Sequence, residues 1–258
     1  MTSVSIIGCG NMGSALIKGL ARAGNHRVTA CDLDVSALDA VDQYCWKTTT
    51  DIEEAAASDV VVVAVKPDTV GVVLDELDLD ADQTLVTIAA GVPRAFVAGR
   101  TDATVVRIMP NLAAETGDMA AAVVWEEEDA DVRAILDDLG EFVVIEEDLM
   151  DVATALNGSG PAFVFYFLQA MKEAAVAEGL AADDAETLTA QTFKGAAETV
   201  LRSEQSVDAL IDAVCSPGGT TIEGMEVLWD SDVEPVVHDT LAAAAERSRE
   251  LAREFDDE

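Results

Sequence analysis

Three glycines near the N-terminus have the spacing of a loop that binds phosphate. Gly8-Cys9-Gly10-Asn11-Met12-Gly13 follows an apolar run and leads into a helical pattern. In such a loop the first glycine permits a tight turn, the second lets the backbone approach a pyrophosphate, and the third lets the helix pack on the strand. The helix N-terminus supplies N–H donors for the phosphates. With Asp32 at the end of the next predicted strand, the segment predicts a dinucleotide site for NADPH or NADH.

Two other segments follow predicted buried strands. In Ala64-Val65-Lys66-Pro67, the Lys66 side chain either meets the coenzyme or lies in solvent. The next strand ends in Ile88-Ala89-Ala90-Gly91, whose small residues would let a flat nicotinamide approach the backbone. Ligands of doubly wound sheets bind beyond the carboxyl ends of the strands, so Ala64 to Pro67, Ala89 and Ala90 are candidate coenzyme contacts.

A further candidate segment, Ser216-Pro217-Gly218-Gly219-Thr220-Thr221, precedes a predicted helix. Glycines before a helix can form a nest of N–H groups that binds a carboxylate. The hydroxyl groups of Thr220 and Thr221 either cap the helix or contact a ligand, and capping is the commoner role for such residues.

The elements that position these segments change in kind along the chain. Apolar runs alternate with helical patterns in the first part, which is typical of a parallel sheet covered on both faces. Strands are expected at 4–8, 27–32, 60–65, 84–89, 104–109, 119–125 and 142–145. Beyond about residue 148 only alanine-rich helical patterns occur. We therefore expect an α/β chain, with a Rossmann-type dinucleotide-binding domain at 1–150 and an all-helical domain at 151–258.

The helix expected from Pro161 is apolar nearly all round, with Phe163, Val164, Phe165 and Tyr166 in succession. A helix without a polar face must be enclosed. We favour enclosure by a second subunit, because a helical domain of about a hundred residues has little interior of its own. A central helix in a monomer is the alternative.

Composition limits the classes of partner. The formal net charge is −35 and the sequence pI is about 4.1, which disfavours binding to nucleic acid or to anionic membranes. No acidic residue occurs from Met1 to Cys31, so the predicted phosphate loop lies in a segment that carries no negative charge, although the chain as a whole is strongly acidic. An acid excess of this size favours a host with molar salt in its cytoplasm over an ordinary low-salt setting.

Cysteine and histidine usage argues against metal chemistry. The cysteines at 9, 31, 45 and 215 have neither metal-type nor redox-type spacing, which predicts free thiols in a reducing compartment. His26 and His238 lie apart from other potential ligands, so no metal site is expected. With no signal-peptide pattern and no apolar run long enough for a bilayer, we expect a cytoplasmic location.

Five motifs occur in the order in which one family has them: Gly8–Gly13, Ala64–Pro67, Arg107-Ile108-Met109-Pro110-Asn111, Gly158-Ser159-Gly160-Pro161-Ala162-Phe163 and Cys215–Thr221. This set resembles that of pyrroline-5-carboxylate reductase and covers nearly the whole chain; the last motif is the most discriminating. The resemblance implies hydride transfer to a cyclic imine, the final step of proline synthesis. It also implies a homodimer intertwined through the helical domain, which in this family is often assembled into a decamer.

The same resemblance assigns roles at the substrate end. It places the substrate carboxylate on Ser216, Gly218, Gly219, Thr220 and Thr221, with the Thr221 hydroxyl near the imine nitrogen. Glu204 matches an acidic position near the substrate, which makes Thr221 and Glu204 the candidate catalytic residues.

Two departures from the family pattern concern the coenzyme. Cys31-Asp32-Leu33-Asp34 is acidic where relatives that prefer NADPH tend to have small hydroxyl or basic residues, and Asp51 stands where some relatives have asparagine. Both departures favour use of NADH at least as well as NADPH.

Two alternatives share the expected architecture. A hydroxyacid dehydrogenase of the 3-hydroxyisobutyrate type would need a basic lysine early on the long helix after the linker, and Lys172 lies well past Gly158-Ser159-Gly160. A non-catalytic nucleotide-binding protein would not need the segment Ser216–Thr221. Both alternatives are therefore disfavoured.

The net charge predicts a stability that depends on salt. The Debye length falls from about 10 Å at 0.1 M to about 3 Å at 1 M ionic strength, so repulsion between surface carboxylates weakens as salt rises. We expect the thermal unfolding midpoint, followed by circular dichroism, to rise as potassium chloride goes from tenths molar to molar. A flat or falling midpoint would contradict this expectation.

Overall fold

The structure is a computed structural model that describes residues 1–255 in two compact units. Unit 1 comprises Met1–Ser159 together with the chain from Leu241 onward, and unit 2 comprises Gly160–Thr240. The boundary expected after residue 150 therefore falls inside unit 1. Asn157 hydrogen-bonds to the sheet, and Ser248 of the last helix hydrogen-bonds to Asp151. The assignment of dinucleotide binding to residues 1–150, and of a separate helical domain to residues 151–258, stays a prediction.

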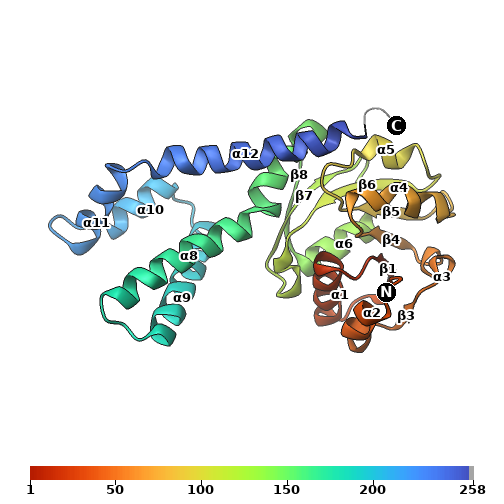
Figure 1. The fold of residues 1–258 in the computed structure, drawn as a ribbon, viewed down its shortest axis with the longest axis horizontal. Coiled ribbons are helices and arrows are strands. Elements are labelled where there is room, and N and C mark those ends of the chain that lie inside the picture. The colour runs from red at the N-terminus through yellow and green to blue at the C-terminus, as the bar shows by residue number, and fades with distance from the viewer. Residues whose placement is uncertain (256–258) are drawn as a thin grey trace. The chain divides into compact units, whose positions relative to one another are not determined.

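An eight-stranded sheet forms the centre of unit 1 (Figure 1), in the order β3-β2-β1-β4-β5-β6-β7-β8. Its pairs are parallel except for β6 and β7, which are antiparallel. The strands are β1 (Ser3–Ile7), β2 (Arg27–Cys31), β3 (Lys47–Thr49), β4 (Val60–Val63), β5 (Thr84–Thr87), β6 (Thr104–Met109), β7 (Met119–Val124) and β8 (Gly140–Val144). A parallel-dominated sheet confirms the predicted fold class.

Helices cover both faces of this sheet, and alternate residues of the strands face opposite layers. Val4 and Ile6 pack with α1 (Asn11–Ala23), α2 (Val35–Val41) and α6 (Ala130–Leu139). Ile7 packs on the other side with α3 (Ile52–Ala56), α4 (Pro67–Glu76) and α5 (Arg94–Ala98). The four valines of β4 are buried on both faces, as expected for a central parallel strand.

Two elements escaped the sequence patterns. Strand β3 is three residues of lysine and threonine with no apolar run, and it is a strand because it pairs with β2. Helix α2 has seven residues and begins after an Asp34 cap on the amide of Ser36. In the described part of the chain, no helix combines the length and apolar character needed to cross a membrane.

Unit 2 is made of helices: α8 (Gly160–Ala177), α9 (Ala182–Arg202), α10 (Val207–Val214), α11 (Thr220–Trp229) and the beginning of α12 (Val233–Arg253). Within residues 160–240, only Ala185 and Thr189 are buried. On α8 the side chains of Phe165 and Tyr166 are 63% and 75% exposed. A single chain therefore does not enclose this helix, as expected of a surface that needs a partner.

Candidate active site

The carboxyl ends of the parallel strands meet at one edge of the sheet, and the predicted coenzyme residues follow them. In spatial order, Asp51 lies just beyond β3, Asp32 follows β2, Gly8 follows β1, Lys66 lies just beyond β4, and Ala89 lies just beyond β5. Acidic groups are therefore on one side of the glycine loop, and Lys66 and Ala89 are on the other. A ligand at such an edge is bound across these strand ends.

Each glycine of the loop meets a different spatial requirement. Gly8 has a φ of +99°, and a Cβ there would lie 2.8 Å from the carbonyl oxygen of Ala64. A Cβ on Gly13 would lie 1.8 Å from the carbonyl oxygen of Gly8. Gly10 has no atom within 4 Å of its would-be Cβ. Gly8 and Gly13 are thus needed for packing, while the open side of Gly10 leaves room for a ligand.

The N-terminus of α1 is suited to an anion. Gly10 is its N-cap, no side chain caps it, and its first turn contains no acidic residue. Its first N–H groups lack intrahelical partners and point toward the strand ends, where they can bind phosphate oxygens.

Asp32 accepts two backbone hydrogen bonds, one from the glycine loop and one from the turn that follows β2. Its Oδ2 accepts the N–H of Cys9 at 2.6 Å, and its Oδ1 accepts the N–H of Asp34 at 2.9 Å. Sequence reasoning expected only a contact to ribose at this position. A carboxylate oxygen accepts more than one hydrogen bond, so Asp32 can brace the loop and still bind a ribose hydroxyl.

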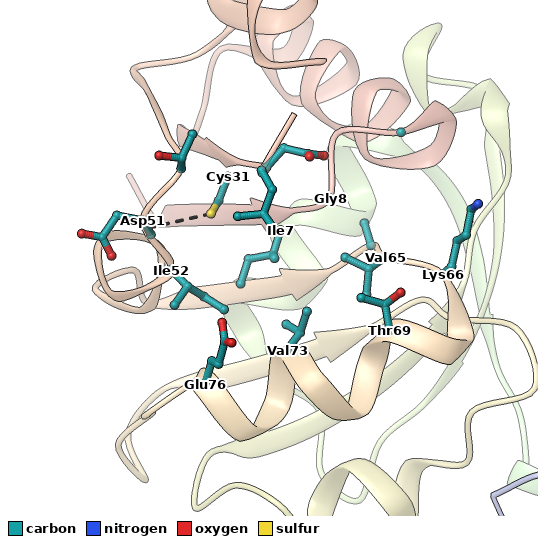
Figure 2. Close-up of a pocket in the computed structure, with 15 residues that line it drawn as sticks. Ile7, Gly8, Cys31, Asp51, Ile52, Val65, Lys66, Thr69, Val73 and Glu76 are labelled. Atoms are coloured by element: carbon teal, nitrogen blue, oxygen red, sulfur yellow. Dashed lines mark hydrogen bonds between the residues drawn. The ribbon is translucent and has the colours of Figure 1, made fainter. Parts of the chain in front are cut away.

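A cavity of about 620 Å³ lies at these strand ends (Figure 2). Lys66 is at one end of it and Asp51 at the other, with Gly8 between them. The lining residues are Ile7, Gly8, Gly10, Cys31, Asp32, Leu33, Thr50, Asp51, Ile52, Ala64, Val65, Lys66, Thr69, Val73 and Glu76. The cavity is large enough for part of a dinucleotide, and its charge is divided between a cationic and an anionic end.

Sequence reasoning missed the contribution of α4 to this cavity. Thr69, Val73 and Glu76 line it from one face of the helix. Their spacing of four and three residues is the helical periodicity that puts side chains on one face, and this was the available signal.

The thiols beside the loop are not nucleophiles. Burial and the nearby Asp32 carboxylate raise the pKa of Cys9 to about 12, and the same two causes raise that of Cys31 to about 11. Both thiols therefore stay protonated at neutral pH, and protonated thiols are unreactive. Within residues 1–255, no group of three or more His, Cys, Asp or Glu side chains is placed to hold a metal ion.

The remaining predicted coenzyme residues lie around the cavity rather than on its wall. Asn11 and Met12 form the first turn of α1, and Pro67 is the first residue of α4. Ala89 is buried, and Ala90 packs beside Met109 in a small core cluster.

The predicted carboxylate-binding segment, in unit 2, is a tight turn before α11. The N–H of Gly219 donates to the carbonyl oxygen of Ser216 at 2.9 Å, and Gly218 has a φ of +69°. Proline at the second position and glycine at the third are typical of a type II turn. The turn leaves Ser216 exposed just before the helix N-terminus.

The structure also bears on the two candidate catalytic residues. Thr221 is the second residue of α11, whose N-cap is Gly219 without a side-chain cap. The alternative that Thr221 caps this helix is therefore not what the structure shows. Glu204 lies exposed in the bend between α9 and α10, also in unit 2.

Arg107, in the third of the five motifs, and Asn157, directly before the fourth, hold the segments on the far side of the sheet edge. Arg107 is buried in β6 and forms an ion pair with Glu147, whose Oε1 also accepts the N–H of Arg94 at 3.1 Å. Asn157, in a π-helical turn, donates to the carbonyl oxygens of Met109 at 2.7 Å and Ala120 at 3.0 Å. These contacts fix the segments that follow β5 and β6.

Comparison with known proteins covers both units. A family model described as pyrroline-5-carboxylate reductase dimerisation matches residues 147–251, and one described as NADP oxidoreductase coenzyme F420-dependent matches residues 3–91. The pyrroline-5-carboxylate reductase of Methanosarcina acetivorans is 36% identical, over 97% of this chain and 98% of its own. This chain belongs to the pyrroline-5-carboxylate reductase family. The Escherichia coli pyrroline-5-carboxylate reductase is 35% identical over the same shares of the two chains.

Solved structures of this family superpose on the whole chain. The pyrroline-5-carboxylate reductase from Coxiella burnetii matches with a TM-score of 0.87 at 33% identity, over 97% of this chain and 98% of its own. The Plasmodium falciparum pyrroline carboxylate reductase, a structure with NADP bound, matches with a TM-score of 0.86 at 28% identity over the same shares. Unit 1 thus has the nucleotide-binding fold of this reductase family, and the helical part contains its dimerisation domain.

The different surroundings of Gly10 and Gly13 predict opposite effects of one added methyl group. We expect Gly13→Ala to lower the free energy of unfolding by about 1–3 kcal/mol, because its Cβ meets a backbone oxygen that cannot rotate away. Gly10→Ala should change it by less than about 0.5 kcal/mol but weaken coenzyme binding, because its methyl group enters the open side of the loop. Urea unfolding and fluorescence titration with NADH measure the two effects. A fully stable Gly13→Ala, or normal coenzyme affinity in Gly10→Ala, would contradict this assignment.

Proposed function

We propose that this protein reduces 1-pyrroline-5-carboxylate to L-proline with hydride from NAD(P)H, the last step of proline biosynthesis. The observation that carries the proposal is the match of 97% of the chain, both units included, to pyrroline-5-carboxylate reductases at 35–36% identity. The coenzyme cavity and the turn before α11 are the structural features that this activity needs.

Unit 1 binds and orients the coenzyme, which supplies the hydride. The N-terminus of α1 and the open side of Gly10 take the pyrophosphate. Asp32 accepts hydrogen bonds from the adenosine ribose, and Lys66 adds a positive charge at the other end of the cavity. Beyond β5, the turn that contains buried Ala89 and partly exposed Ala90 has only small side chains, which leaves room for the nicotinamide. Cys9, Asn11, Met12, Gly13, Ala64, Val65 and Pro67 shape this site through the backbone.

Unit 2 provides the substrate contacts. The turn Ser216–Gly219 and the N-terminus of α11, with Thr220, hold the substrate carboxylate. The Thr221 hydroxyl hydrogen-bonds the imine nitrogen, and Glu204 is the acidic group near it. A protonated imine accepts hydride at carbon and becomes a neutral amine, so no base is required. Catalysis is then mainly positioning of the imine carbon against the hydride donor.

The structure adds an argument against the dehydrogenase alternative. Lys172, the lysine of α8, forms an ion pair with Glu186 of α9. That pairing links two helices of unit 2 and makes Lys172 a poor candidate for the general base that alcohol oxidation needs. Membership of the reductase family disfavours a non-catalytic role.

The helical part is the self-association surface. The exposed apolar side chains of α8, together with the match to a dimerisation family model, support a homodimer formed through this unit. Assembly of such dimers into a decamer is the further oligomeric state that we propose. The small-molecule imine is the other partner; a chain with a net charge of −35 is poorly suited to nucleic acid.

We place the enzyme in the cytoplasm of a cell with high internal salt. The four cysteines are free thiols in the structure, which fits a reducing compartment. The net charge supports the salt requirement, because salt ions must screen the repulsion among the carboxylates for the chain to stay compact.

Turnover of pyrroline-5-carboxylate with each coenzyme tests the proposed activity. We expect proline to form, with kcat/KM for NADH at least equal to that for NADPH in the same salt, because Asp32 repels a 2′-phosphate. Asp32→Asn retains an oxygen acceptor but removes the charge, and should shift the ratio toward NADPH. Absence of turnover would overturn the proposed function. A strong NADPH preference that is unchanged in Asp32→Asn would overturn only the role of Asp32.

Thr221 provides the test of the substrate end. Thr221→Ala should lower kcat/KM for the imine by roughly 10²–10⁴-fold, the range for hydrogen-bond or acid assistance. Thr221→Ser should keep most activity because it retains the hydroxyl. Coenzyme affinity should change little, since the coenzyme phosphates bind at Gly8–Gly13.

The same preparations separate catalysis from folding. Because no side chain caps α11, Thr221→Ala should lose less than the roughly 1 kcal/mol of a lost helix cap. Normal turnover by folded Thr221→Ala would remove this hydroxyl from the mechanism.

A further inference from the structure

The turn after β5, Ala89–Val92, is covered by the last helix of the chain. The N–H of Val92 donates to the carbonyl oxygen of Ala89 at 3.4 Å, and Gly91 has a φ of +77°. A Cβ on Gly91 would lie 2.6 Å from Cβ of Leu251 and 3.2 Å from the backbone nitrogen of Ala252. The backbone of α12 therefore lies directly on this turn, at a position where only glycine fits both the conformation and the space.

The end of α12 and the two residues that follow it are anchored to the rest of unit 1 at two further points. Phe255 packs edge-on against Phe96 of α5, with ring centroids 4.9 Å apart. Ser248 is buried and donates to Oδ1 of Asp151 at 2.6 Å. Figure 1 shows this C-terminal end beside α5, the helix that begins just after the turn. The position of the turn thus depends on residues that are about 160 positions further along the sequence.

The other side of the turn is held from the sheet. Glu147, paired with buried Arg107, accepts the N–H of Arg94 directly after the turn. Ala89 is 4% exposed and Val92 is fully buried, while Ala90 between them is partly exposed. The turn is therefore fixed on both sides, and Ala90 is its accessible residue.

We infer that the C-terminal segment Ala245–Phe255, made of the end of α12 and the two residues that follow it, is a positioning element of the coenzyme site. It fixes the position of the Ala89–Val92 turn relative to the strand ends, and the nicotinamide is held against that turn. The segment itself does not touch the coenzyme. This inference rests on the proposed function, which places the nicotinamide at Ala89 and Ala90. It assigns a role at the coenzyme site to a helix in the part of the chain matched by the dimerisation model.

Binding of two ligands tests this inference without any turnover. ADP-ribose occupies the adenosine and pyrophosphate part of a dinucleotide site but lacks the nicotinamide. We expect Phe255→Ala and Gly91→Ala to raise the dissociation constant of NADH at least fivefold while leaving that of ADP-ribose within twofold. Phe255→Leu should restore most of the NADH affinity, because it refills the contact with Phe96. A general loss of unit 1 stability would weaken both ligands equally.

The control lies on the same helical segment. Arg247 is exposed and pairs with Glu250, so Arg247→Ala should bind both ligands as the native chain does. Equal weakening of NADH and ADP-ribose in Phe255→Ala, or no weakening of either, would overturn the inference. Imine turnover by the native chain is measured separately, so that failure of the proposed function is distinguished from failure of this positioning role.

Discussion

Helix α1 lies so close to the glycine loop and to the 3-10 helix Leu112–Glu115 that backbone meets backbone. A Cβ on Gly13 would fall 1.8 Å from the Gly8 carbonyl oxygen, and one on Gly19 would fall 2.2 Å from the Ala114 carbonyl oxygen. These two contacts, one in the first turn of the helix and one in its second half, fix the position of α1. Its N-terminus is thereby held at the strand ends, and the cavity, the Asp32 hydrogen bond to Cys9 and the open side of Gly10 all depend on that placement. Bulkier residues at either position would push α1 away from these backbone neighbours, and the anion-binding N-terminus of α1 would move as well.

Acidic residues are absent from the segment that contains α1 and the glycine loop. The first 31 residues contain no acid in a chain of net charge −35, and they include the whole of α1 and the glycine loop. An anionic ligand can therefore approach the helix N-terminus without meeting a carboxylate in the loop itself. The cavity's other end is lined by the carboxylates of Asp32 and Asp51. The exposed acids elsewhere contribute to solvation, and salt screens their repulsion.

The two units differ in how they bury apolar surface. Unit 1 has large core clusters on both faces of its sheet, so it can be stable as a single chain. In unit 2 the aromatic side chains of α8 are exposed, and only Ala185 and Thr189 are buried. The contact of helix with helix inside this unit is therefore too limited to enclose its apolar residues. Self-association of the kind that the dimerisation model describes would remove that surface from water.

The sequence by itself determined the elements with strong periodicity and the chemistry of the loop. The valine run of β4, the glycine spacing at 8, 10 and 13, and the turn with Pro217 and Gly218 are local signals, because each follows from backbone geometry within a few residues. Local backbone geometry of this kind is readable before any fold is known. The all-round apolar character of α8 likewise indicated a surface that needs a partner.

Only the tertiary structure decided the features that join distant residues. Strand β3 exists because β2 offers it a pairing edge, and β7 runs antiparallel to β6 although its own sequence is indifferent to direction. Asp32 braces the loop, one face of α4 lines the cavity, and Gly91 lies under Leu251. A local pattern fixes which way a chain turns and which face is apolar. It does not fix which remote backbone will occupy the space beside it, because that depends on how all the layers pack at once.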